Sequence, residues 1–503
     1  MMRKIPAVMA TQHPDNASSP YWHPEGDGFI NALAEAKECH ECFETLGVDE
    51  YMWDWEGKQA DAAVVDRLLS NYHNFFVKKQ LGRDIFLTFR LPNIWTEKGY
   101  SLIQAMTAIL IAEDFGKDLG FKQRPLFEVI LPMTEGADQL MKMHELFEKL
   151  ARFKSKTFNG GRINTDYLEL IPLVEGVDNQ LKVGDLLKDY VAQHQKHFKR
   201  APAYIRPFLA RSDPAMASGL LATVLANKIA ISEMAAFSKE QSIPIFPILG
   251  VGSLSFRGGL TPENVNEYIR NNPGIRTVTL QSSFRYDYPK QQVMRAIQAL
   301  EKGLAKSKPH SIDNHDVGIL TKLAKTSESY YQTTLEKIVN DLTGVFQAVP
   351  RRRERRLHIG LLAYQRTIGQ QNLPRAITFT CGFYSVGIPP EFIGLGRALA
   401  KLSESQLQIL QENYPSLVQD LQRAGRYLNK QNLAKLAKRN RAWRDVLEDI
   451  EMAESVLGLK FGPRTYSQNA HVNLSANVLM AKNNQAILPG LITELAQLRK
   501  SLG

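Results

Sequence analysis

The chain has 503 residues, of which 44% are hydrophobic and 23% charged, a composition typical of a soluble globular protein. Its formal net charge of +10 fits either a small anionic substrate or a polyanion, although the charge is scattered and only 351–356 is densely basic. Three cysteines imply no disulfide framework. With no apolar signal region and no run of about 18 apolar residues, we expect a cytoplasmic protein without a membrane span.

Short apolar runs alternate along the chain with longer stretches of helical periodicity. The helical stretches include 63–76, 101–116, 137–153 and 216–237. The eight predicted strands are 50–56, 85–92, 126–133, 168–175, 204–211, 243–250, 276–283 and 376–383. Strands that are apolar on both faces, each followed by a helix, are typical of a parallel sheet covered by helices. Eight such units predict an α/β fold, a closed (β/α)8 TIM barrel.

Two regions depart from this repeat, and both look helical. We predict one catalytic unit over 1–503, in which 1–49 is an N-terminal segment that carries the sequence TQHPD. The barrel is predicted over 50–395, with a helical insertion at about 290–374, and a C-terminal helical region over 396–503. We expect the additional α-helical segments to pack on the barrel; alternatively, the C-terminal region forms an oligomer contact.

Two of the predicted strands end in a carboxylate. The run 168–175 ends on Glu175, and Asp213 follows the run 204–211. Because the carboxyl ends of barrel strands meet at one rim, these side chains suggest ligands for a hard cation such as Mg²⁺, which takes only one or two protein carboxylates. The alternative is that Glu175 caps the next turn and Asp213, ahead of Pro214, begins a helix.

Arginines recur at the same rim. They are Arg90, Arg211, Arg257, Arg285, Arg366 and Arg375. Arg257 lies in the glycine-rich stretch 250–259, whose backbone amides can approach an anion closely. Together with the two carboxylates, these arginines suggest a phosphorylated acid bound beside a metal, since the guanidinium suits carboxylate and phosphate alike. For any one arginine the alternative is a surface ion pair, and for 250–259 it is a solvated loop.

The N-terminal sequence ATQHPDNA holds a histidine in a rigid turn. His13 lies between Gln12 and Pro14. Such a turn can aim an imidazole at the rim as a proton shuttle or a cation. The alternative is an Asx-type turn in which the histidine is incidental, and the local sequence alone favours that alternative.

Several segments resemble the archaeal-type phosphoenolpyruvate carboxylases, the short form of that enzyme. They are MRKIPAVMATQHPDNA near the start, FRGGLTPEN in the middle, and RRLHIGLLAYQR with LPRAITF further on. In this order the combination is specific, and the resemblance covers essentially the whole chain. It implies a carboxy-lyase that converts phosphoenolpyruvate and bicarbonate to oxaloacetate and phosphate.

A more distant similarity to the long bacterial and plant type implies residue roles. TQHPD resembles its Thr-Ala-His-Pro-Thr motif, which makes His13 the counterpart of the catalytic histidine. FRLPN and SFRGG resemble segments with catalytic arginines, which implies that role for Arg90 and Arg257. IPLVEGVD and ARSDPAMASG are similar to the segments that carry the metal ligands, and so imply Glu175 and Asp213 as ligands of Mg²⁺ or Mn²⁺.

The same similarity extends to the phosphate of the substrate, with departures. AYQR and LPRAI look like Gly-Ser-Arg and Leu-Arg-Ala-Ile, which places Arg366 and Arg375 on the phosphate. The long type's His-Gly-Arg-Gly-Gly is LGVGS here, and its lysine after the metal aspartate is Met216. The candidates to replace these charges are Arg206, Arg211, Arg285 and Lys58. We predict that Arg211 and Arg285 bind substrate.

The resemblance also implies a reaction course. Bicarbonate attacks phosphoenolpyruvate at phosphorus to give carboxyphosphate and the enolate of pyruvate, and the enolate captures carbon dioxide. A divalent metal stabilises the enolate, and the irreversible reaction supplies four-carbon acids. The family is typically homotetrameric.

Two alternative functions are open. Another metal–enolate enzyme on the same barrel, such as a phosphonomutase or an aldol-type lyase, would keep the carboxylates and arginines but would not require bicarbonate. A nucleic-acid-binding protein would use 351–356 and show a steep salt dependence. Since the strand-end pattern would then have no purpose, we expect no nucleic-acid partner.

Overall fold

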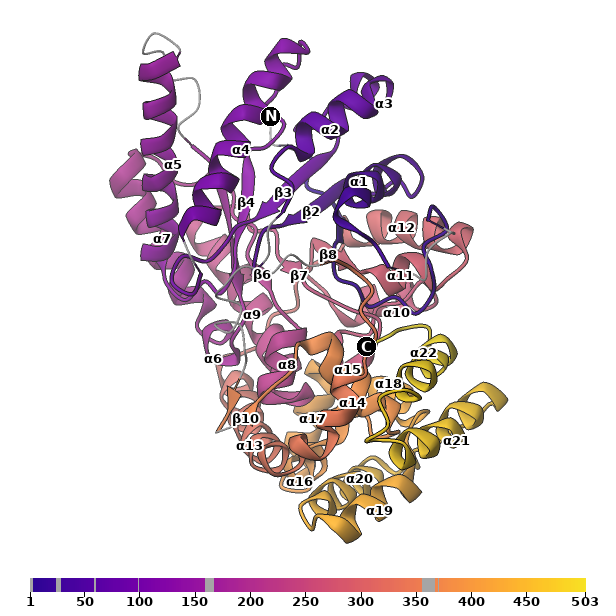
Figure 1. The fold of residues 1–503 in the computed structure, drawn as a ribbon. Helices are drawn as coiled ribbons and strands as arrows, with labels where there is room; N and C mark the ends of the chain where they lie inside the picture. Colours follow the sequence, from indigo (N-terminus) through magenta and orange to yellow (C-terminus); the bar gives the residue numbers. More distant parts are fainter. Residues whose placement is uncertain are drawn as a thin grey trace.

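Eight parallel strands close into a barrel, and helices cover it and extend from one end (Figure 1). The computed structural model describes residues 3–23, 29–57, 60–97, 99–158, 167–354, 367–369 and 371–503. The barrel strands are β1 (Val8–Thr11), β2 (Glu50–Asp54), β3 (Phe86–Arg90), β4 (Glu128–Leu131), β5 (Glu169–Val174), β6 (Phe208–Leu209), β7 (Ile248–Leu249) and β8 (Thr277–Leu280). They pair in chain order, and Val8 of β1 lies opposite Val278 of β8 to close the ring.

The barrel class is confirmed, and seven of the eight predicted strands overlap β2 to β8. The predicted strand at 376–383 is wrong, because this stretch forms the helix α15 (Ala376–Ser385). Periodicity cannot separate a short apolar strand from a helix that is buried on nearly all sides. The missing strand is β1, so the segment predicted to precede the barrel supplies its first strand.

Helices surround the barrel between successive strands. They are α1 (Glu35–Glu44), α2 (Val64–Asn71), α3 (His73–Lys78), α4 (Gly99–Asp118), α5 (Ala137–Phe158), α6 (Val177–Gln180), α7 (Val183–Phe198), α8 (Ser212–Ser218), α9 (Leu220–Gln241), α10 (Val265–Asn271), α11 (Ser282–Tyr286) and α12 (Lys290–Leu304). Within the described residues, α9 is the one helix long and apolar enough to cross a membrane, and 78% of its most apolar window is buried in the fold. That burial is typical of a core helix.

The chain after α12 is mainly helical, but because β8 is the last barrel strand, the region predicted as an insertion at about 290–374 follows the barrel and does not interrupt it. Its helices are α13 (Asn314–Ile338), α14 (Thr343–Gln347), α15, α16 (Leu395–Leu399), α17 (Glu404–Asn413), α18 (Leu417–Gly425), α19 (Lys430–Arg439), α20 (Trp443–Leu457), α21 (Tyr466–Met480) and α22 (Leu488–Arg499). A small antiparallel pair, β9 (Thr367–Ile368) and β10 (Gln371–Asn372), interrupts them. In Figure 1 the end of the chain lies beside α15, next to the barrel.

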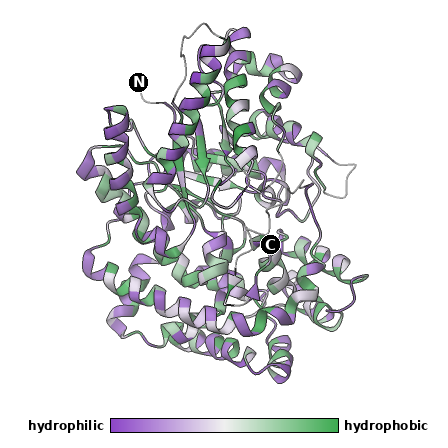
Figure 2. Cartoon of the chain, turned by 60° about the vertical axis from the view of Figure 1, so that its left-hand side comes forward, coloured by the Kyte–Doolittle hydropathy of each residue, from purple (hydrophilic) through white to green (hydrophobic). Residues whose placement is uncertain are grey.

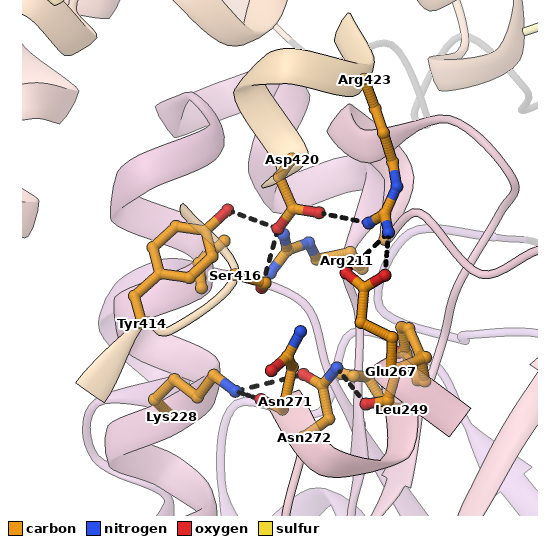
Figure 3. Close-up of a pocket in the computed structure, with 13 residues that line it drawn as sticks. Arg211, Lys228, Leu249, Glu267, Asn271, Asn272, Tyr414, Ser416, Asp420 and Arg423 are labelled. Carbon is orange, nitrogen blue, oxygen red and sulfur yellow. Dashed lines mark hydrogen bonds and ion pairs between the residues drawn. The ribbon is translucent and has the colours of Figure 1, made fainter. Parts of the chain in front are cut away.

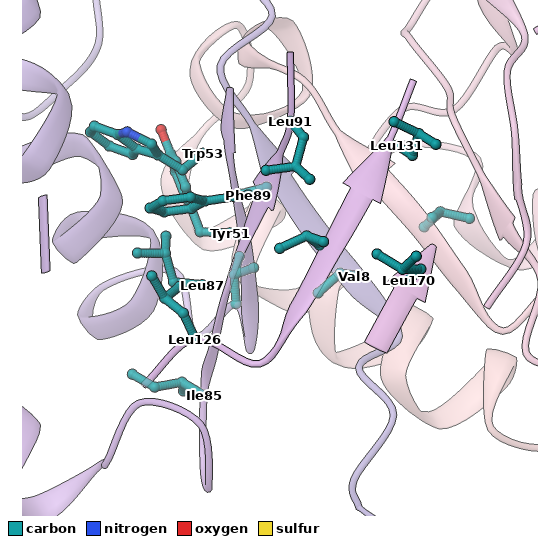
Figure 4. Packing of buried hydrophobic residues seen from close by; sticks show 14 of the residues in the cluster. Val8, Tyr51, Trp53, Ile85, Leu87, Phe89, Leu91, Leu126, Leu131 and Leu170 are labelled. Carbon is teal, nitrogen blue, oxygen red and sulfur yellow. The ribbon is translucent and has the colours of Figure 1, made fainter. Parts of the chain in front are cut away.

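Apolar side chains pack on both faces of the barrel wall. The interior cluster consists of Met9, Met52, Ile130, Ile171, Leu173, Phe208, Ala210 and Ile248. On the outer face, Tyr51, Trp53 and Phe89 belong to the layer between strands and helices (Figure 4). Helices are apolar toward this layer and polar on the outside (Figure 2). Burial on both faces explains the continuous apolar runs in the sequence.

The amino-terminal end of the barrel is closed by buried charges. The Arg206 guanidinium lies 2.7 Å from a Glu50 oxygen and 2.5 Å from a Glu128 oxygen, at the starts of β2 and β4. Burial opposes the charge of Arg206, but these carboxylates raise its pKa. Arg206 therefore lies at the opposite end from the rim where sites form in this fold.

Candidate active site

Polar side chains gather where the barrel strands end. His13 follows β1, Arg90 ends β3, and Glu175 directly follows β5. Asp213 lies in the first turn of α8, after β6, and Arg257 lies in the loop after β7. In barrels of this type the carboxyl ends of the strands form the active-site rim. The structure thus places these five predicted residues at that end.

Carboxylates are concentrated at the rim around Glu56, two residues beyond β2. Burial, together with the charges of Glu175, Asp54 and Asp213, raises the pKa of Glu56 to about 8 against the opposing effect of Arg90. Burial is the largest cause of this shift, and the neighbouring carboxylates add to it. Carboxylate oxygens are the donors that a hard divalent cation prefers, so Glu175 and Asp213 are candidate ligands for a metal at this rim.

Arg90 is anchored within this acidic group. Its Nε and Nη2 donate to the two oxygens of Asp54 at 2.8 and 2.9 Å, and Nη1 lies 2.6 Å from Glu56. Burial opposes the charge, yet Asp54 and Glu56 raise the pKa of Arg90 well above its usual value. A bidentate pair of this kind fixes the plane of the guanidinium. Arg90 is therefore a rigid, fully charged group.

Arg257 is also held from several sides. Its side chain is 1% exposed and donates to Ser212 Oγ at 3.1 Å, Gln281 Oε1 at 2.5 Å and Asp15 Oδ2 at 3.3 Å. It also donates to the backbone oxygen of Gly503. Burial lowers the pKa of Arg257, and the charges of Asp15 and Asp213 oppose this shift. A cation in the rim loop is thus set in place next to the metal-ligand candidate Asp213.

The turn after β1 is built into the same framework. His13 is half-buried, with Nδ1 2.9 Å from Thr11 Oγ1, and its carbonyl accepts from the Ser282 amide. Asp15, two residues on, is fully buried and accepts from the Ser283 amide at 2.7 Å. The turn therefore connects His13 to Asp15, which pairs with Arg257. This role of Asp15 was not predicted from the sequence.

The predicted phosphate-binding arginines are placed only in part. Arg375 precedes α15 and is solvent-exposed, and the charges of Glu56, Asp54 and Asp213 act on it. It therefore faces the rim from the segment after the barrel. Arg366 and Lys58 lie outside the described residues.

Two of the predicted substrate-binding arginines make contacts away from this group. Arg285 is fully buried in α11, where it donates to the Thr11 carbonyl at 2.6 Å and contacts Glu38 at 3.2 Å and Cys42 Sγ at 2.8 Å. Arg211 lines a separate pocket behind β6 and β7 (Figure 3). The structure brings neither side chain into the group around Glu56.

A different acidic cluster is exposed at the start of α13. It consists of Asp313, His315 and Asp316, whose ligand atoms lie within 4.8 Å of one another. Asp313 caps the helix by accepting from the Asp316 amide at 2.9 Å. Helix capping accounts for this cluster, which is separate from the predicted metal ligands.

A closed parallel barrel whose rim gathers carboxylates and arginines has the architecture of the (β/α)8 enzymes. The sequence model of the family described as "Phosphoenolpyruvate carboxylase" matches residues 5–503. The chain therefore belongs to the phosphoenolpyruvate carboxylase family.

Relatives along the whole chain carry the same name. The phosphoenolpyruvate carboxylase of Leuconostoc mesenteroides is 47% identical over 502 residues, covering 100% of this chain and 99% of the relative. That of Metallosphaera sedula is 38% identical over 520 residues, covering 100% of both chains. Among solved structures, the magnesium/glyoxylate complex of Haloferax volcanii malate synthase has a TM-score of 0.35 at 12% identity over 68% of this chain and 94% of that one, too low to bear on function.

Proposed function

We propose that this chain carboxylates phosphoenolpyruvate with bicarbonate to give oxaloacetate and phosphate. The observation that carries the proposal is the gathering of Arg90, Arg257 and Arg375 around the carboxylates of Glu175 and Asp213 at the barrel rim. The substrate is a trianion when fully ionised, so it needs several fixed cations. The enolate formed from it must also be stabilised by a positive charge. A metal held by the carboxylates would supply that charge.

Each rim residue has a task in this reaction. A bicarbonate oxygen attacks phosphorus, the bond from phosphorus to the enol oxygen breaks, and the products are carboxyphosphate and the enolate. Arg375, together with Arg366, would neutralise the phosphoryl group, because positioning and charge supply most of the catalysis in phosphoryl transfer. Arg90 and Arg257 would hold the carboxylate of the substrate and bicarbonate, since their contacts fix the direction of each guanidinium.

Carboxyphosphate then yields carbon dioxide and phosphate, and the enolate carbon bonds to carbon dioxide. The contact of His13 Nδ1 with Thr11 orients the imidazole. We assign His13 Nε2 as the atom that exchanges a proton with carboxyphosphate and with phosphate. The Asp15–Arg257 contact would keep this turn aligned with the bicarbonate site.

Glu175 and Asp213 would hold Mg²⁺ or Mn²⁺. When bound, the ion supplies Lewis-acid stabilisation of negative charge at the enol oxygen. The raised pKa of Glu56 supports this assignment, because a divalent cation would offset the crowded carboxylates. We further propose a cytoplasmic homotetramer that uses neither nucleic acid nor membrane as a partner.

Purified protein is expected to form oxaloacetate only when phosphoenolpyruvate, bicarbonate and a divalent metal are all present. The measurement is the oxidation of NADH by added malate dehydrogenase, with parallel reactions that lack bicarbonate or contain EDTA. Added Mg²⁺ or Mn²⁺ should restore the EDTA-treated reaction. Phosphoenolpyruvate consumption that is independent of bicarbonate would instead favour another metal–enolate reaction on the same barrel.

A further inference from the structure

A small polar pocket lies outside the barrel wall, behind the ends of β6 and β7. It is enclosed by α9, α10 and the segment that leads into α18 (Figure 3). Its cavity volume is about 20 Å³, room for a single small ion or one or two water molecules. None of the residues assigned above to phosphoenolpyruvate, bicarbonate or the metal lines it, apart from Arg211, whose predicted substrate role the rim geometry does not support.

Two cations face each other across this pocket. Figure 3 shows the Arg211 guanidinium on one side and the Lys228 amine on the other. The Lys228 amine donates to the Asn271 carbonyl and to Asn272 Oδ1, the latter at 3.2 Å. A protonated amine has three N–H donors, so one remains for a further acceptor. Burial, together with the charge of Arg211, lowers the pKa of Lys228 to about 7 against the opposing charge of Asp420. Within the described part of the chain, no carboxylate forms a salt bridge with Lys228.

The acidic groups at the pocket are already engaged. Asp420 accepts from Tyr414 at 2.9 Å and from Ser416 at 3.0 Å, and lies 3.3 Å from Arg423. Both carboxylate oxygens of Glu267 accept from Arg423 Nη2 at 2.6 Å. Asp420 also lies beside Arg211 (Figure 3), and the charges of Arg211 and Arg423 both lower its pKa against the effect of burial. The negative charge at the pocket is therefore shared between these two arginines, and Lys228 forms no salt bridge with it among the described residues.

Two buried donors point to an occupant. Tyr268 is 6% exposed and Arg211 is 7% exposed, and both line the pocket. Tyr268 Oη and Arg211 Nε have no hydrogen-bond partner among the described residues. Buried donors without a partner are uncommon and costly, so something normally satisfies them.

We propose that this pocket binds a small monovalent anion, either chloride or a one-carbon oxyanion such as formate or bicarbonate. The donors Tyr268 Oη, Arg211 Nε and Lys228 Nζ surround a space too small for a dicarboxylate. Arg211 is followed directly by Ser212, whose hydroxyl accepts from Arg257, and by Asp213. An anion on Arg211 therefore fixes the start of α8, the turn that carries a metal-ligand candidate.

Thermal unfolding of the full chain tests the proposal. Sodium chloride and sodium formate are compared with sodium gluconate, an anion too large for the cavity, at equal ionic strength. Chloride or formate is expected to raise the midpoint saturably by about 1–2 °C over gluconate at roughly tenfold excess over Kd. The anion with the lower half-saturation concentration identifies the preferred occupant.

Variants connect this shift to the pocket. Tyr268→Phe removes one unpartnered oxygen and is expected to fold, while weakening the anion-dependent rise; Lys228→Met is expected to abolish it. Lys239→Met, an exposed lysine on the same helix, is the matched control and should respond like wild type. Equal chloride and gluconate curves in wild type, or a full chloride response in both pocket variants, would overturn the proposal and leave water as the occupant.

Discussion

Replacing Asp213 with alanine is expected to lower kcat about 10³-fold and to weaken the dependence of activity on Mn²⁺. A metal that stabilises transition-state charge contributes several kcal/mol, and each 1.36 kcal/mol corresponds to a factor of ten. Asp213 is half-buried in the first turn of α8, where alanine preserves the helix at the loss of about 0.3–1 kcal/mol of dipole interaction. The measurement is kcat against Mn²⁺ concentration, alongside the unfolding midpoint.

Asp316→Ala provides the control, because it removes a carboxylate from the exposed acidic cluster at α13. That variant should retain wild-type turnover and metal dependence. If Asp213→Ala kept ordinary activity with an ordinary metal response, Asp213 would not be a ligand, and its carboxylate would serve only to begin α8.

Replacing Arg257 with lysine is expected to lower kcat/KM by about 10²- to 10³-fold, the scale of losing an aligned donor at a developing charge. Lysine keeps the positive charge but lacks the planar fork that reaches Ser212, Gln281 and Asp15 together. Loss of these buried contacts should also cost about 1–3 kcal/mol of stability. Steady-state kinetics over both substrates and a denaturant titration give the two quantities.

Arg353→Lys separates catalysis from stability. Arg353 is equally buried and pairs with Glu35 at 3.1 Å and Glu38 at 2.6 Å. Its replacement should lower stability to a similar extent while kcat/KM, per folded molecule, stays near wild type. An Arg257→Lys enzyme that loses stability alone, as expected for Arg353→Lys, would assign Arg257 a purely structural role.

Most of the barrel could be predicted because burial on both faces of a parallel sheet leaves a direct pattern of apolar runs. The two ends of the repeat could not. β1 ends at Thr11 and α1 begins only at Glu35, so the pattern of a strand closely followed by a helix is absent there. The run 376–383 has the composition of a strand, but helical packing on nearly all sides requires the same residues.

The rim could be predicted from position, whereas side-chain direction could not. Glu175 and Asp213 follow strands, and topology alone brings such residues to one end of the barrel. Arg285 also follows a strand, yet its partner Glu38 comes from α1, 247 residues earlier in the chain. Asp54 and Glu56 were visible at the end of a predicted strand, but only the structure shows that they hold Arg90.

Transfer of ¹⁸O from fully labelled bicarbonate tests the account most directly. If bicarbonate attacks phosphorus at this rim, one ¹⁸O enters phosphate and two enter the new carboxylate of oxaloacetate. The measurement is the ¹⁸O content of the phosphate by mass spectrometry, taken early enough to limit exchange with water. One label per phosphate is the predicted result. Unlabelled phosphate formed together with oxaloacetate would contradict a carboxyphosphate route and the roles proposed for His13 and Arg257.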